Sequence, residues 1–302
     1  FNGLAADGPR LLFKGGTSLS KAFGLISRFS EDIDITVFRD DLGQKADVAE
    51  LDALSGKKRR ARLDAIRMAC QRYIAGPLFE QFNQLAASII PTARYRLEID
   101  PEDKDGQTLL FWYPAVTASV GDYIRSAVKI ESGAKSALDP HIATTIHPYV
   151  AEDVSGLNLQ VANITTVKPE RTFCDKVIIL HGLRQWHDRR HQLRHGGQRV
   201  SRHYYDVHQL VQAAAATEWR ADHTLAIDCA HHARLFFGSA DLGLDTAAHG
   251  TFTLAPSPAM RDALGKDYTA MSGMIFGEIP SLDSVLASIE RFEQIVNSSA
   301  GA

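Results

Sequence analysis

The sequence has few cysteines, no long apolar run and little net charge. Its three cysteines, Cys70, Cys174 and Cys229, are far apart in the sequence and form no Cys-x-x-Cys pair. This spacing argues against a disulfide framework and a cysteine-based zinc site. No apolar run reaches the roughly 18 residues that a membrane-spanning helix needs, and no signal peptide is visible. We therefore expect a cytoplasmic protein with reduced thiols and no membrane partner.

Composition and length indicate a globular protein with two domains. Hydrophobic residues make up 45% of the chain and charged residues 23%, which argues against disorder. A chain of 302 residues is long for a single hydrophobic core. The formal net charge is −3, so the protein as a whole is not a polycation, and any contact with a polyanion depends on local clusters.

The hydrophobic pattern predicts an α+β first domain and a helical second domain. Short apolar or alternating runs, typical of strands, occur at 11–13, 32–38, 94–100, 108–114, 126–132 and 161–167. Residues 40–90 have helical composition, and long stretches rich in alanine, leucine and arginine follow Lys168. We therefore expect a mixed-sheet domain over 1–165 with a helical insertion over 40–90, and a helical domain over 166–302.

The run Lys-Gly-Gly-Thr-Ser-Leu at residues 14–19 is a candidate phosphate-binding turn. Gly15 and Gly16 follow the first strand and open a helix, where unpaired backbone N–H groups and the helix dipole favour an anion. Thr17 and Ser18 add hydroxyl groups. Taken alone, a glycine pair at such a place is usually only a tight turn.

Two aspartates follow about fifteen residues later. Asp32 and Asp34 are separated by one residue on a predicted strand, so both side chains leave the same face and can bind the same divalent ions. Such a pair is more often solvated surface charge. Mg²⁺ held by paired carboxylates, next to a turn that holds a triphosphate, is nevertheless the combination that nucleotidyl transfer needs.

Residues 14–35 resemble the nucleotidyltransferases of the DNA polymerase β superfold, and more narrowly the AbiEii toxin family, which includes the MenT-type toxins. The Gly-Gly-Thr-Ser-Leu run matches the first motif of this family, G-G-T-[AS]-L, and residues 28–34 match the second, R-x-S-x-D-I-D, with the same spacing between them. The resemblance implies a polymerase-β-like core with a mixed sheet, followed by a helical C-terminal domain. It covers the chain to about residue 210.

The resemblance also implies the residues of the site. Two Mg²⁺ ions would be held by Asp32 and Asp34, with Glu131 on a later strand as third carboxylate and as the group that helps deprotonate the attacking hydroxyl. The phosphates of the NTP substrate would be held by Lys14, Gly15, Gly16, Thr17, Ser18, Ser30, Lys176 and Arg202. Asp206 would orient Lys176 or the nucleotide.

Two basic clusters indicate a polyanionic acceptor. The first lies in residues 184–203, for which we expect a long loop, and contains Trp186, several histidines and the proposed acceptor-binding residues Arg184, Arg189, Arg190 and Arg194. The second covers residues 57–62 in the helical insertion. Arginine next to aromatic side chains suits phosphate backbones and unstacked bases, although each cluster alone is more often a solvated face.

The sequence therefore predicts an enzyme that moves NMP from an NTP to an acceptor hydroxyl. The family resemblance implies the toxin of a toxin–antitoxin pair, with a cognate antitoxin as partner and RNA, in particular the tRNA 3′ end, as acceptor. Two alternatives remain open at this point. The acceptor is a protein or a small molecule such as an aminoglycoside, or the chain is a nucleotide-binding regulator without turnover, although a pure binder has no need of two metals.

Overall fold

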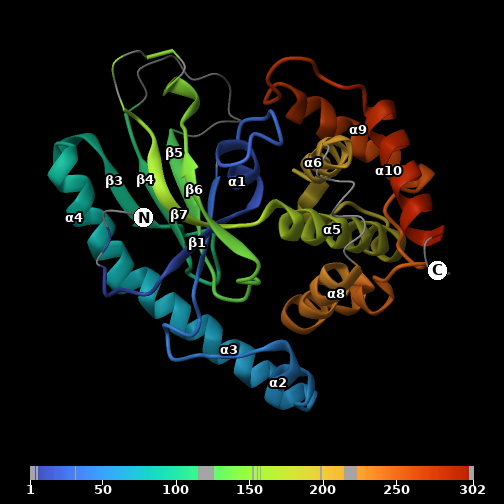
Figure 1. The fold of residues 1–302 in the computed structure, drawn as a ribbon, viewed down its shortest axis with the longest axis horizontal. Helices are drawn as coiled ribbons and strands as arrows, with labels where there is room; N and C mark the ends of the chain where they lie inside the picture. The colour runs from blue at the N-terminus through green and yellow to red at the C-terminus, as the bar shows by residue number, and fades with distance from the viewer. Residues whose placement is uncertain are drawn as a thin grey trace. The chain divides into compact units, whose positions relative to one another are not determined.

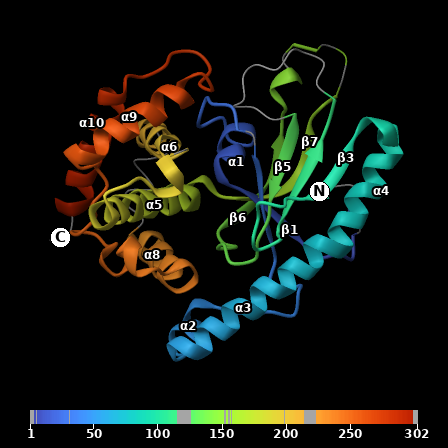
Figure 2. The same ribbon diagram turned by 180° about the vertical axis from the view of Figure 1, so that it is seen from behind.

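The computed structural model describes residues 4, 6–30, 32–114, 126–151, 153–154, 156, 158–197, 199–213 and 223–298. The chain divides into two compact units, whose elements are labelled in Figure 1 and seen from behind in Figure 2. The first unit comprises residues 1–22 and 30–167, and the second comprises residues 23–29 and 168–302. The chain thus leaves the first unit after residue 22, contributes the short segment 23–29 to the second unit, and returns to the first unit before Asp32.

The first unit is built on a seven-stranded sheet of order β3-β4-β5-β2-β1-β7-β6. The strands are β1 Leu11–Lys14, β2 Asp32–Val37, β3 Arg96–Ile99, β4 Thr108–Trp112, β5 Ala127–Glu131, β6 His141–Ile146 and β7 Val161–Val167. Strand β2 pairs antiparallel with β1 and parallel with β5, β1 pairs parallel with β7, and the remaining neighbours are antiparallel. The mixed sheet of an α+β fold is therefore confirmed.

Strand β6 has no counterpart among the strands predicted from the sequence. It lies at the edge of the sheet and pairs antiparallel with β7. Its first three residues, His141, Ile142 and Ala143, are all exposed, so the strand lacks the alternation of apolar and polar residues that marks a half-buried strand. Backbone pairing with β7, rather than burial of a face, defines this strand.

The helices of the first unit are α1 Gly15–Lys21, α2 Val48–Asp52, α3 Gly56–Tyr73 and α4 Phe79–Ile89. A π-helical segment, Ile74–Leu78, joins α3 to α4 and contains Pro77, whose missing N–H disrupts the regular ladder of helical hydrogen bonds. Helix α4 contacts the edge strand β3, and both views place the two side by side (Figures 1 and 2). Helix α1 follows β1 without an intervening loop, because Gly15 takes a left-handed conformation at φ +76°.

The second unit is helical and contains α5 Pro169–Arg190, α6 Ser201–Gln212, α8 His223–Phe237, α9 Pro258–Ser272 and α10 Leu282–Ser298. Helix α5 packs against α6 and α8, and α6 packs against α9 and α10 (Figure 1). The long loop predicted over 184–203 is wrong at both ends. Helix α5 continues to Arg190 and ends where His191 adopts φ +54°, and α6 already begins at Ser201. Among the described residues, no helix is long and apolar enough to cross a membrane.

Segment 23–29 is attached to the second unit by main-chain hydrogen bonds. The N–H of Phe29 donates to the carbonyl of Met274 at 2.7 Å, and the N–H of Phe276 donates to the carbonyl of Ser27 at 2.8 Å. The hydroxyl of Tyr205 donates to the same Ser27 carbonyl at 3.4 Å. These bonds fix the position of Arg28 within the second unit.

Candidate active site

Strand pairing gathers the candidate metal ligands of the first unit on one face of the sheet. Asp34 on β2 lies opposite Glu131 on β5 and opposite Lys14 on β1. Asp32 lies opposite Lys129, one pleat further along. Because residues opposite one another across a sheet, and residues two apart along a strand, point to the same face, these five side chains share that face. The three carboxylates thus lie on one face of the sheet, although about a hundred residues separate β2 from β5 in the sequence.

The donor set of this face suits a hard cation. Asp32 is buried, with 4% of its surface exposed, and Asp34 and Glu131 are half-buried. In the parts of the chain that the structure describes, no three His, Cys, Asp or Glu side chains converge on a single point as a complete metal site. Asp32 and Asp34 nevertheless offer two carboxylates, which is the protein share of many Mg²⁺ sites, whose remaining ligands are water and substrate phosphates.

Lys129 also lies on this face, although it belongs to neither of the two sequence motifs. Its Nζ lies 2.8 Å from Glu131 Oε1 and 3.7 Å from Asp100 Oδ2. Burial lowers the pKa of Lys129, but Glu131, Asp32 and Asp100 outweigh this effect, so the pKa is raised and the ammonium stays charged. The signal is present in the run Ala-Val-Lys-Ile-Glu, since alternation along a strand puts Lys129 on the side of Glu131.

The glycine turn lies directly against Asp34. A Cβ placed on Gly15 would come 2.2 Å from Asp34 Oδ2, and the φ of +76° is itself unfavourable for any other residue. Lys14, the residue before the turn, has its Nζ 3.7 Å from Asp34 Oδ1. Gly16 is buried in the first turn of α1. The strand, the turn and the carboxylate therefore form one packed arrangement that only glycine permits at position 15.

The hydroxyl groups next to the turn bond within the protein. Thr17 Oγ1 lies 2.7 Å from Ser30 Oγ and also hydrogen-bonds to the carbonyl oxygen of Asp32. Ser18 has no exposed surface, and its hydroxyl donates to the carbonyl of Gly15 at 2.9 Å. In this arrangement Thr17 and Ser30 tie α1 to the beginning of β2, and Ser18 supports the turn from inside.

A second cluster, in the second unit, joins Arg28, Lys176 and Asp206. Arg28 donates through Nε to Asp206 Oδ1 at 2.7 Å and through its terminal nitrogen to Oδ2 at 2.8 Å. Lys176 Nζ lies 2.8 Å from the same Oδ2. All three side chains are buried, and Asp206 has no exposed surface. The structure thus brings together Lys176 of α5 and Asp206 of α6, and adds Arg28, which the sequence analysis includes in a motif without giving it a role.

The charges of this cluster depend on one another. Burial alone would raise the pKa of Asp206, but Arg28 and Lys176 hold it well below the usual range of an aspartate. Burial lowers the pKa of Lys176, and the carboxylate of Asp206 opposes that shift. His203, one turn before Asp206 on α6, has its pKa lowered far below 6.5 by burial and by the neighbouring Lys176 and Arg202. The two basic side chains of the cluster thus share the carboxylate of Asp206.

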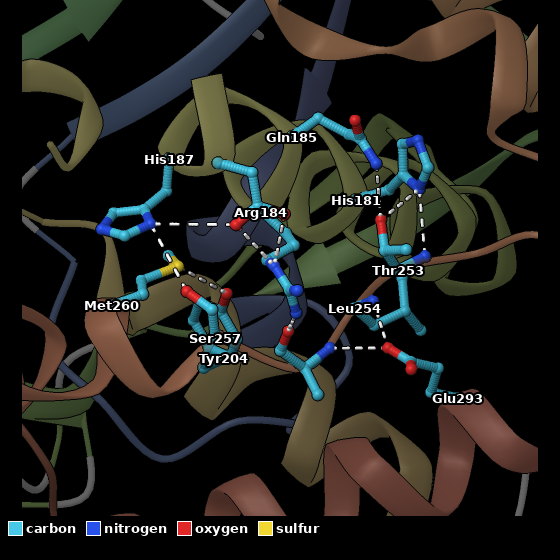
Figure 3. A network of polar contacts seen from close by, with 12 residues as sticks. His181, Arg184, Gln185, His187, Tyr204, Thr253, Leu254, Ser257, Met260 and Glu293 are labelled. Atoms are coloured by element: carbon cyan, nitrogen blue, oxygen red, sulfur yellow. Dashed lines mark hydrogen bonds and ion pairs between the residues drawn. The ribbon is translucent and has the colours of Figure 1, made fainter. Parts of the chain in front are cut away.

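Arg184 is part of the packing of the second unit rather than of an open basic surface. Its Nε lies 2.8 Å from Asp188 Oδ2, and its Nη1 donates to the carbonyl of Ala255 at 2.6 Å. Figure 3 shows the guanidinium inside a network of polar contacts in which Glu293 accepts from the N–H groups of Leu254 and Ala255. These contacts hold the guanidinium of Arg184 against the second unit.

The remaining arginines lie at the end of α5 and just beyond it. Arg190 forms an ion pair with Asp241 at 2.7 Å. The guanidinium groups of Arg190 and Arg194 lie 5.8 and 5.7 Å from the centre of the Trp186 ring. Arg189 is exposed, and Arg202 is half-buried on α6. The basic and aromatic side chains of this stretch are thus grouped, although Arg190 already has an acidic partner.

Comparison with known proteins identifies the family. The family model described as nucleotidyl transferase AbiEii toxin, type IV toxin–antitoxin system, matches residues 2–298. The chain belongs to the AbiEii family. It is therefore a nucleotidyltransferase and the toxin of a type IV toxin–antitoxin system, and membership implies an NTP substrate and a cognate antitoxin.

Among solved structures, this AbiEii protein is similar to MenT4, a nucleotidyltransferase toxin from Mycobacterium tuberculosis, with 13% sequence identity and a TM-score of 0.47. The alignment covers 97% of this chain and 77% of that chain. A search of curated proteins gave no significant match.

Gly15→Ala should destabilise the protein more than an equivalent change at an open left-handed glycine. The new Cβ must displace the carboxylate of Asp34 in addition to adopting an unfavourable φ. Gly43→Ala is the matched control, because Gly43 has φ +67° and no atom lies within 4 Å of the position that its new Cβ would take. In urea denaturation we expect a loss of about 1 kcal/mol for the control and at least about 2 kcal/mol for Gly15→Ala. Equal losses would mean that Asp34 is not pressed against the turn.

Asp206→Asn should lower the free energy of unfolding by about 3–5 kcal/mol, because Arg28 and Lys176 would remain buried without their carboxylate. Asp188→Asn, which removes an exposed partner of Arg184, should cost less than about 1 kcal/mol. Both values can be measured by urea denaturation at neutral pH.

The pH dependence gives a second readout for Asp206. A carboxylate whose folded-state pKa is depressed stabilises the protein above its unfolded pKa of about 3.9, and this stabilisation is lost as the pH falls towards the folded value. The stability of the wild type should therefore fall more steeply below about pH 4 than that of Asp206→Asn. Parallel curves would contradict the assignment.

Proposed function

We propose that this AbiEii protein transfers NMP from an NTP to a hydroxyl group of RNA, with the tRNA 3′ end as acceptor, in a Mg²⁺-dependent reaction in the cytoplasm. The observation that carries the proposal is the juxtaposition of Asp32 and Asp34 with the Gly15 turn on one face of the sheet. It supports a site at which a metal-bound triphosphate contacts both carboxylates and backbone.

Asp32 and Asp34 are the proposed metal ligands. When bound, Mg²⁺ neutralises phosphate oxygens and lowers the pKa of the attacking hydroxyl. The protein contributes two oxygen donors held by the pairing of β2 with β1 and β5, and Asp34 is further fixed by the turn at Gly15. Glu131, opposite Asp34, is the proposed third carboxylate and accepts the proton of the attacking hydroxyl.

The phosphates of the nucleotide are assigned to the turn and to basic side chains. Lys14 precedes the turn, and the first N–H groups of α1 have no acceptor within the helix. The family resemblance adds Lys176 and Arg202 as phosphate contacts. Asp206 then acts as a positioning residue, because its carboxylate holds the ammonium of Lys176 at 2.8 Å. Thr17, Ser18 and Ser30 support the turn from within.

The reaction balances as an in-line displacement. The acceptor hydroxyl oxygen forms a bond to the α-phosphorus of the NTP, and the bond from that phosphorus to the bridging oxygen breaks. Pyrophosphate leaves, and the hydroxyl proton passes to the carboxylate of Glu131. Positioning and electrostatic stabilisation provide most of the catalysis in such a transfer.

RNA is the proposed acceptor because of the basic and aromatic side chains at the end of α5. Arg190 and Arg194 lie on the ring of Trp186, and Arg189 is exposed beside them. Guanidinium groups bind phosphates, and an aromatic ring offers a surface for an unstacked base. Arg184 supports the packing of α5 through its bonds to Asp188 and to the carbonyl of Ala255.

Asp32→Asn and Asp34→Asn should each lower kcat/KM for nucleotidyl transfer by at least about 100-fold, since each removes a charge that holds the metal. The assay contains each α-labelled NTP in turn, Mg²⁺ and total cellular RNA, and the labelled product is sized on a gel. Asp40→Asn is the control, because Asp40 is exposed in the same unit and should leave the rate unchanged. Full activity in either active-site variant, with the fold intact by circular dichroism, would refute the proposed metal site.

The triple variant Arg189→Ala, Arg190→Ala, Arg194→Ala should raise the apparent KM for RNA and leave the affinity for NTP unchanged. Each arginine that contacts a phosphate should also flatten the plot of log affinity against log salt by about one unit when it is removed. RNA binding at several salt concentrations, measured by fluorescence anisotropy, checks this.

The second basic cluster provides the comparison. The triple variant Lys57→Ala, Lys58→Ala, Arg60→Ala on α3 also removes three positive charges, as the α5 variant does. All three side chains are exposed. If this variant alone weakens RNA binding and flattens the salt dependence, the acceptor binds at α3 and the assignment to α5 is wrong. If neither variant alters the salt dependence, the acceptor is not RNA.

A further inference from the structure

The carboxylates on the active face of the sheet share it with an ammonium group supplied by the chain itself. Asp100 directly follows β3, and its N–H donates to the carbonyl of Thr108, which lies opposite Glu131. One line across the sheet therefore runs from Asp100, at the end of β3, through Thr108 on β4 and Glu131 on β5 to Asp34 on β2. Lys129 lies one pleat away and contacts two of these three carboxylates.

The charges on this face limit what the nucleotide-free protein can bind. Around Lys129, four carboxylates, Asp32, Asp34, Asp100 and Glu131, share the face with the ammonium groups of Lys14 and Lys129. The pair of Arg96 and Glu98 further along β3 adds no net charge to this count. Two negative charges remain, which is the charge of one divalent cation. Without Lys129, three negative charges would remain, and Glu131 and Asp100 would both lose their contact with its ammonium group.

The position of Lys129 also explains why no complete three-carboxylate site is formed in the described residues. Glu131 is the third carboxylate that the family resemblance implies, and its Oε1 lies 2.8 Å from Lys129 Nζ. An ammonium at this distance uses an oxygen that would otherwise face a metal ion. Asp100 is buried, and its Oδ2 lies 3.7 Å from the same ammonium. The Lys129 ammonium therefore lies between the carboxylates of Glu131 and Asp100.

We propose that Lys129 takes the place of a second metal ion in the nucleotide-free protein, so that Asp32 and Asp34 hold one divalent cation and the Lys129 ammonium supplies the other positive charge. This inference rests on the proposed metal site. It makes Lys129 a residue that sets metal stoichiometry, and it changes the two ions expected from the sequence to one in the absence of NTP.

The test measures how many Mn²⁺ ions the nucleotide-free protein binds, and how tightly. Calorimetry gives the affinity, and electron paramagnetic resonance of the unbound ion gives the number bound. Lys129→Met removes the ammonium but keeps an unbranched side chain of similar length. It should bind one more Mn²⁺ per chain than the wild type, or bind its ion at least about tenfold more tightly, because a unit charge is removed from close to the site. Lys129→Arg keeps the charge and should behave as the wild type.

The control for net charge is Lys104→Met, since Lys104 is exposed in the loop between β3 and β4. It should leave both the number of bound ions and their affinity unchanged. Lys129→Met should also gain thermal stability on addition of Mn²⁺, with a larger shift of Tm than the wild type, because the ion replaces the lost ammonium. This readout confirms that the variant is folded.

The outcomes separate this inference from the proposed function. If the wild type already binds two ions, or if Lys129→Met binds Mn²⁺ with the stoichiometry and affinity of the wild type, the role of Lys129 is refuted. The metal site itself still stands in that case, provided that Asp32→Asn and Asp34→Asn lose binding. If neither the wild type nor Lys129→Met binds Mn²⁺, both the inference and the proposed metal site fail.

Discussion

The pairing of β2 with its two neighbours is the constraint on which the candidate site of the first unit depends. Parallel pairing with β5 puts Asp34 opposite Glu131, and antiparallel pairing with β1 puts Asp34 opposite Lys14. A shift of either register by one residue would turn the partner side chains to the other face of the sheet. The Gly15 turn adds a second restraint, because it leaves no room for a Cβ beside Asp34. Backbone geometry, rather than side-chain flexibility, thus defines this group of charges.

In the second unit, charged side chains are positioned by direct contacts within the buried cluster of Arg28, Asp206 and Lys176, whereas strand pairing positions them in the first unit. Asp206 is the only acid among these three buried groups, and it holds both cations by direct contacts. A buried ion pair contributes little net stability, but removal of one partner is costly. Arg28 belongs to segment 23–29, which bonds to the second unit, and it precedes Asp32 of the first unit by four positions in the sequence. The motif at residues 28–34 therefore supplies Arg28 to the second unit and Asp32 to the first.

Much of this arrangement can be predicted from the sequence, because local patterns encode it. The alternation in Asp-Ile-Asp-Ile-Thr-Val gives both the strand and the common face of Asp32 and Asp34. The glycine pair gives the turn. Partners that are set by tertiary contacts are not visible in this way: the bond from Arg28 to Asp206 spans 178 residues, and the approach of Lys129 to Asp100 depends on how β3, β4 and β5 pair. For the same reason, the sequence does not reveal the bond from Arg184 to the carbonyl of Ala255, which is distant in the chain. Strand β6 is likewise not predicted, because it is an exposed edge strand without alternation and is defined by its pairing with β7.

The central claim is that the chain transfers a nucleotide, and not a phosphate, to RNA. The most direct measurement supplies the protein with RNA, Mg²⁺ and an NTP labelled either at the α- or at the γ-phosphate, for each of the four nucleotides. The account predicts that RNA becomes labelled from the α-position of at least one NTP, while the γ-label leaves as pyrophosphate. Label that enters RNA from the γ-position, or no labelled RNA with any of the four nucleotides, would contradict it.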